Sequence, residues 1–68
     1  MSKDIFACEV GDIVRDKVTG FEGIITYIDE EKALIHTDVN MFGRYTPIAF
    51  TFHQLEIIDE LNPKYKFN

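Results

Sequence analysis

The stretch that decides the fold is Val18-Thr19-Gly20-Phe21-Glu22-Gly23, a short segment with two glycines between two runs of β-type residues. Gly20 and Gly23 can take positive φ or let another backbone approach closely, because neither carries a Cβ atom. Phe21 stands between them, where it can return a large apolar side chain to a core. The segment therefore predicts a tight turn in an all-β protein.

The runs around this turn are rich in the β-branched and aromatic residues typical of strands. The expected strands cover residues 13–18, 24–28, 33–37, 48–53 and 56–59. Residues 29–32 have the charged composition of a hairpin tip, and residues 53–55 fit a single helical turn before the last strand. Five short strands in this order predict a small five-stranded barrel in one domain, residues 1–60.

Residues 38–47 have the composition of an irregular loop, since they contain Asp38, Asn40, Gly43 and Pro47. The same segment holds side chains of the types enriched at protein interfaces, namely Met41, Phe42, Arg44 and Tyr45. Two interpretations stay open. Either these side chains bind a partner, or Phe42 and Tyr45 fill one end of a barrel too small to close on its own strands.

The last residues, 61–68, are expected to form a tail outside the barrel. Beyond Pro63, lysine alternates with an aromatic residue, so an extended tail would present Tyr65 and Phe67 on one face. Such a tail either remains loosely docked or adds a strand to a sheet edge of this or another chain. Edge strands or the tail would then also allow a homo-oligomer.

Composition limits the class of protein. The chain has 68 residues, of which 46% are hydrophobic, so it can bury one small core. The single cysteine, Cys8, forms no internal disulfide, and no apolar stretch reaches the ~20 residues of a membrane span, so we expect a cytoplasmic protein. The net charge of −5 opposes nonspecific attraction to nucleic acid or anionic lipid and favours basic partners.

Residues with the chemistry of catalysis or cofactor binding are few. Cys8 lacks a Cys-x-x-Cys partner, and the two histidines, His36 and His53, lack the spacing of a metal site. The two turn glycines are not followed by the lysine and helix of a phosphate-binding loop. Asp16 is expected to accept N–H bonds from the turn. The sequence therefore predicts no catalytic residue, no cofactor and no metal.

Residues 10–25 carry a resemblance to a known family. They read Val-Gly-Asp-Ile-Val-Arg-Asp-Lys-Val-Thr-Gly-Phe-Glu-Gly-Ile-Ile. This segment resembles short, mostly uncharacterised bacterial and bacteriophage proteins with the pattern Gly-Asp-x-Val-x-Asp-x-Val-Thr-Gly-Phe-x-Gly-x-Val, and it is similar to the KOW motif. The resemblance implies a Src-homology-3-like barrel and, if the chain is virus-encoded, a place in the host cytoplasm. KOW modules often contact RNA or ribosomal and transcription proteins, although those that bind nucleic acid are usually basic.

These observations favour a non-enzymatic adaptor or inhibitor that binds a protein through residues 41–47, with Tyr65 and Phe67 contributing. An acidic surface that mimics nucleic acid is a variant of this hypothesis. The alternative is a KOW-like module that binds single-stranded nucleic acid by aromatic stacking and a few cations. Its candidate residues are Tyr27, Phe42 and Tyr45 for stacking, with Arg15, Lys17 and Arg44 for phosphate.

Overall fold

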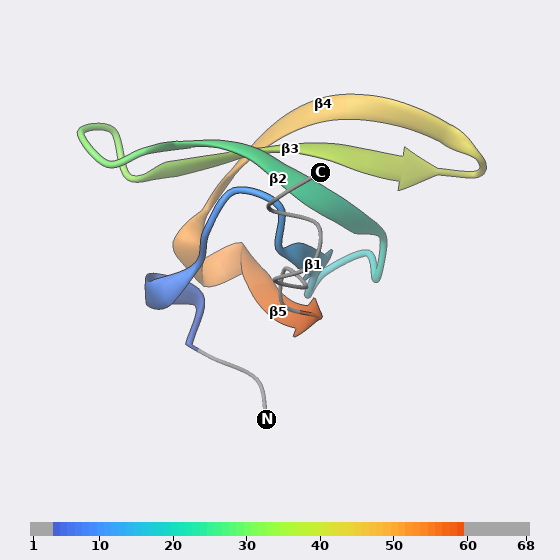
Figure 1. The fold of residues 1–68 in the computed structure, drawn as a ribbon. Helices are drawn as coiled ribbons and strands as arrows, with labels where there is room; N and C mark the ends of the chain where they lie inside the picture. Colours follow the sequence, from blue (N-terminus) through green and yellow to red (C-terminus); the bar gives the residue numbers. More distant parts are fainter. Residues whose placement is uncertain (1–3, 60–68) are drawn as a thin grey trace, which may run out of the picture.

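The computed structural model describes residues 4–59. In chain order its elements are η1 (Ile5–Ala7), β1 (Ile13–Asp16), β2 (Glu22–Asp29), β3 (Leu34–Met41), β4 (Arg44–Thr51), η2 (Phe52–Gln54) and β5 (Leu55–Asp59). The five strands form one antiparallel sheet in the order β4-β3-β2-β1-β5, and the longer β2, β3 and β4 curve over the shorter β1 and β5 (Figure 1). The predicted all-β Src-homology-3-like barrel, with one helical turn before its last strand, is confirmed.

The core lies inside the curve of the sheet because side chains alternate between its two faces. Along β3, Ile35 and Val39 point inward and are buried, whereas His36 and Asn40 lie on the other face and are partly or fully exposed. The buried apolar residues are Val14, Ile25, Ile35, Val39, Phe50, Leu55 and Ile57. Every strand contributes at least one of them, so the core joins the whole sheet. Neither helical segment between residues 4 and 59 could span a bilayer, since each has three residues.

Residues 38–47 are not an irregular loop, and that prediction was wrong. The strand β3 continues to Met41 and β4 begins at Arg44, so only Phe42 and Gly43 connect them. Their φ angles of +56° and +85° are both left-handed, as in the type I′ turns that suit two-residue hairpins. Such turns usually have Asn, Asp or Gly at the first position. Here that position is Phe42, so the sequence does not indicate the turn. The Asn40 Oδ1 atom accepts a hydrogen bond of 2.8 Å from the Gly43 N–H, which braces the turn.

The turn between β1 and β2 is held by Asp16. Its carboxylate accepts hydrogen bonds of 2.9 Å from the Val18 N–H and of 2.9 Å from the Thr19 hydroxyl. Gly20 has a φ of +83° and donates its N–H to the Asp16 carbonyl at 2.8 Å, while Phe21 packs against the core. Thus one buried side chain and one left-handed glycine reverse the chain.

The sheet ends in β4 on one side and in β5 on the other, and Pro47 interrupts the open edge at β4. Met41 and Arg44 flank the two-residue turn, so they form a hydrogen-bonded pair. From there along the two strands, hydrogen-bonded and non-hydrogen-bonded pairs alternate. The pair Asp38 and Pro47 is then of the non-bonded kind, in which the backbone of Pro47 faces the open edge. Pro47 therefore removes an outward N–H donor without weakening the β3–β4 ladder.

We expect a Pro47→Val variant to self-associate, because it would complete the row of donors on the open edge. The mean mass measured by sedimentation should rise with protein concentration. Ala49→Val is the matched control. The backbone of Ala49 faces the open edge as that of Pro47 does, but Ala49 already has an N–H group there. A mass for Pro47→Val that stays constant, or one that rises equally in the control, would show that Pro47 does not protect the edge.

Candidate partner-binding face

Two turns meet at one end of the barrel and bring an exposed aromatic residue, Phe42, against a partly buried one, Phe21. The β3–β4 turn carries Phe42, and the β1–β2 turn leads into Phe21. Their ring centroids lie 5.3 Å apart in an edge-to-face arrangement with an interplanar angle of 81°. Figure 1 shows the two turns at the same end of the molecule, opposite the β2–β3 turn. We call Phe42, Arg44 and Tyr45 at this end the tip cluster.

The aromatic residues of the tip cluster are largely in water. Phe42 is 92% exposed and Tyr45 is 64% exposed. The contact with Phe21 therefore covers only a small part of Phe42. These exposures exclude the interpretation in which Phe42 and Tyr45 fill an end of the barrel.

Phe42 combines this exposure with a strained backbone. A side chain with a Cβ atom in the left-handed region costs about 1–2 kcal/mol relative to the right-handed region, and bulky residues are uncommon there. Local strain of this kind tends to persist at functional sites. Glycine or asparagine would fit the turn better, so the needs of the fold do not account for Phe42.

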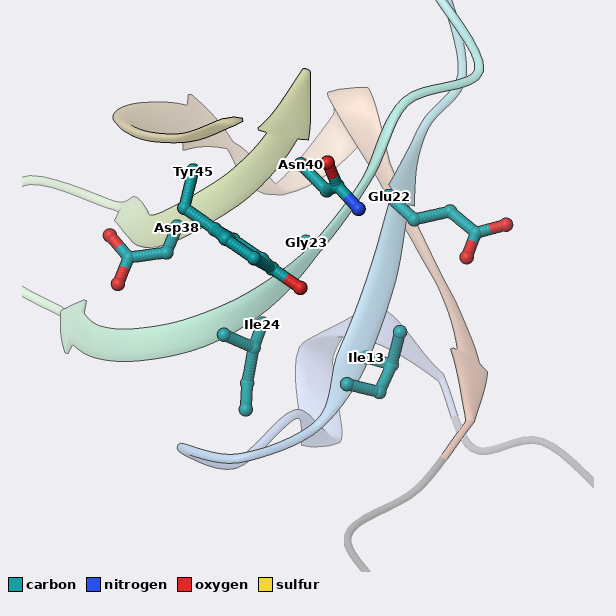
Figure 2. Close-up of a pocket in the computed structure, with 7 residues that line it drawn as sticks. All are labelled: Ile13, Glu22, Gly23, Ile24, Asp38, Asn40 and Tyr45. Carbon is teal, nitrogen blue, oxygen red and sulfur yellow. The ribbon is translucent and has the colours of Figure 1, made fainter. Parts of the chain in front are cut away.

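Beside the tip cluster, the outer face of the sheet is hollowed by an open pocket of about 400 Å³. Figure 2 shows the ring of Tyr45 lying across the sheet, with its hydroxyl end near Ile24 and Ile13. The carboxylates of Asp38 and Glu22 lie on opposite sides of this ring. The full lining is Ile13, Glu22, Gly23, Ile24, Asp38, Asn40 and Tyr45.

The strand register explains why residues so far apart in sequence line one pocket. Ile24 of β2 pairs with Ile13 on one side and with Asp38 on the other. In the next row, Asn40 of β3 pairs with Glu22 and with Tyr45. The sequence did not reveal this pocket because residues 38–47 have the composition of a loop. The period-two alternation of Asp38 and Asn40 with Thr37 and Val39 is the signal that would have indicated a strand there.

The remaining candidate residues lie elsewhere. His36 contacts Tyr27, with centroids 5.4 Å apart, whereas His53 contacts Phe6 at 6.0 Å. Cys8 is partly buried against the core. Among residues 4–59, no three or more histidine, cysteine or acidic side chains are grouped closely enough to hold a metal ion. The predicted tail contacts Tyr65 and Phe67 lie outside the described residues.

Of the cations proposed for nucleic acid, Arg15 already has a partner. Its Nε atom lies 2.9 Å from Oε2 of Glu56, across the β1–β5 pair, with both side chains partly exposed. Arg44 follows the β3–β4 turn and makes no ion pair within residues 4–59. The basic residues in that range are Arg15, Lys17, Lys32 and Arg44.

The fold and its β1–β2 turn define a small Src-homology-3-like barrel of the KOW type. No protein-family model matches the chain. The chain is similar to the transcription termination/antitermination protein NusG of Liberibacter asiaticus, with 45% identity over 38 residues, which are 56% of this chain and 54% of the relative. Similarity to NusG extends over 75% of this chain for Vibrio vulnificus (37% identical) and 81% for Rickettsia bellii (38% identical).

The matches cover only part of the length of each relative. The chain spans about half of the Liberibacter protein and 30% of each of the other two. The similarity fits the C-terminal KOW domain of NusG, and the resemblance to KOW modules is thereby confirmed.

Proposed function

We propose that this chain is a non-enzymatic module that binds a protein partner through the tip cluster. The observation that carries the proposal is Phe42, a phenylalanine that is 92% exposed and held at a φ of +56°. Phe42 has Tyr45 and Arg44 beside it on the same hairpin, and these residue types dominate the energy of protein interfaces. The tip needs no rearrangement to present them.

The partner that we propose belongs to the transcription or ribosomal machinery. The relatives are transcription termination/antitermination proteins, which supports a partner in the transcription machinery. The net charge of −5 favours a basic protein as the partner. Tyr65 and Phe67, outside the described residues, remain proposed contributors to the same contact.

The test is affinity capture from a bacterial lysate with and without nuclease, read by mass spectrometry. We expect one protein or one small set of proteins in both samples, and its loss from a variant with Phe42→Ala and Tyr45→Ala. Tyr27→Ala is the matched control, because Tyr27 is an exposed aromatic residue on a strand away from the tip (58% exposed). Capture that survives the double substitution would rule out the tip cluster as the site.

The same experiment separates the nucleic-acid mimic from binding through the tip. A mimic would bind through its carboxylates, so added salt should weaken capture steeply while loss of Phe42 should matter little. Binding anchored by aromatic burial should be lost with Phe42 and should weaken less with added salt, because apolar burial does not depend on ionic screening.

A KOW-like module for single-stranded nucleic acid is the second candidate. Its support is the similarity to a transcription protein together with Arg44, which lies in the sequence between the exposed aromatic residues Phe42 and Tyr45. Stacking contributes about 1–3 kcal/mol per base and tolerates any sequence. Retention of labelled single-stranded RNA at moderate salt, lost in Arg44→Gln and in Phe42→Ala, would establish it. If nuclease treatment abolished the capture of proteins, that result would also support nucleic-acid binding.

A further inference from the structure

The pocket on the outer face is acidic and has no cation of its own. Glu22 and Asp38 stand on either side of it, and neither carboxylate makes a hydrogen bond or an ion pair in the part of the chain that the structure describes. None of the lining residues is basic. A cation bound in this pocket would be attracted by whichever of the two carboxylates it reaches.

The floor and wall of the pocket are apolar and aromatic. Ile24 is 37% exposed although it lies in the middle of a sheet, and Ile13 beside it is partly buried. The ring of Tyr45 forms one wall above them (Figure 2). A bound side chain therefore needs a carbon stem to cover the isoleucines and a positive group that reaches a carboxylate.

Arginine fits this combination of an apolar floor, an aromatic wall and carboxylates better than lysine does. Its methylene stem can lie on Ile13 and Ile24 while the flat guanidinium stacks on the Tyr45 ring. The guanidinium also pairs with a carboxylate through two hydrogen bonds, whereas the lysine ammonium is a compact and strongly hydrated charge. A phosphate group would be repelled by Glu22 and Asp38.

We propose that this pocket receives an arginine side chain of the protein that the tip cluster captures. The inference rests on the proposed function, since Tyr45 belongs to both surfaces. The tip cluster then supplies the apolar anchor, and the pocket selects partners with an arginine near the segment that covers Phe42. The predicted partner segment is basic, in agreement with the charge of the chain.

The test uses small probes in place of the unidentified partner. Acetyl-arginine-methylamide is titrated into the isotopically labelled full chain, and the amide shifts of Ile24, Asp38 and Tyr45 are followed. The citrulline derivative has the same shape without the charge, and the lysine derivative has the charge without the flat fork. We expect saturable shifts at the pocket for arginine, weaker ones for lysine and none for citrulline.

The matched variant replaces both carboxylates by amides, Glu22→Gln with Asp38→Asn. Because one exposed ion pair contributes about twofold to fivefold in affinity, the double variant should bind arginine about twofold to fivefold more weakly. Both side chains lie on the outer face, so an unchanged amide spectrum elsewhere verifies the fold. Equal shifts for citrulline, equal shifts for lysine, or no loss in the variant would overturn the assignment of arginine.

Failure of this inference is distinguishable from failure of the proposed function. Capture that depends on Phe42 but is unaffected by Glu22→Gln with Asp38→Asn would leave the tip cluster intact and remove the arginine pocket. Shifts at the pocket amides on addition of single-stranded RNA would assign this face to nucleic acid and overturn the inference.

Discussion

A Phe42→Asn variant is expected to be more stable than the natural chain and to lose its partner. Asparagine tolerates the left-handed conformation, so the substitution relieves about 1–2 kcal/mol of backbone strain. It also removes the edge-to-face contact with Phe21, which is worth about 0.5 kcal/mol at so exposed a position. The net gain in the free energy of unfolding should be about 1 kcal/mol.

The same substitution should weaken binding by at least about thirtyfold, since an aromatic hot spot contributes ~2 kcal/mol or more. Urea denaturation measures the first effect and titration calorimetry with the captured partner measures the second. Tyr27→Asn is the control: it should keep the partner and gain no stability. Retained binding in Phe42→Asn would show that Phe42 is not the anchor. A loss of stability would mean that its contact with Phe21 outweighs the strain.

Gly23→Ala is expected to have the largest effect on the fold. A Cβ atom at this position would lie 2.7 Å from the carbonyl oxygen of Asp38 and 3.0 Å from the Cα atom of Val39. Both atoms belong to the backbone of β3, so β2 and β3 would have to separate. We expect a loss of about 2–4 kcal/mol, a large share of the ~3–10 kcal/mol typical for a chain of this size.

Gly20→Ala is the matched substitution at the glycine of the β1–β2 turn. Its φ of +83° strains any side chain, but no atom lies within 4 Å of an added Cβ. The expected loss is about 1 kcal/mol, from backbone strain alone. Urea denaturation of both variants compares them directly. Similar losses at the two positions would show that the approach of β3 to Gly23 is not the cause.

Most of the barrel could be predicted from the sequence because most of its strands have the residue composition typical of strands. Ile24 to Ile28 is almost wholly β-branched or aromatic, and Gly20 marks the turn before it. The β3–β4 hairpin was missed for a physical reason. Outward positions of a strand tolerate Asp38 and Asn40 as well as a loop does, and Phe42 stands where asparagine or glycine is usual. The helical segment η1 has only three residues and left no pattern in the sequence.

The candidate site was predictable only in part. Residue type alone indicated Phe42, Arg44 and Tyr45 as interface residues, because such side chains are costly to expose without a use. The pocket could not be found in this way. It exists because register pairs Ile24 with Asp38 and Asn40 with Tyr45, and pairing across strands is not visible in a linear sequence without the turn that sets it.

The two-residue turn at the tip also has a thermodynamic consequence for the binding that we propose. Asn40 and Gly43 hold Phe42 on a hairpin with only two connecting residues. The backbone of the tip therefore has little conformational entropy to lose when a partner binds. Association then requires only a correct collision and no prior rearrangement of the tip. Its rate should depend on diffusion and charge steering, while the lifetime of the complex depends on how deeply the partner encloses the phenylalanine ring.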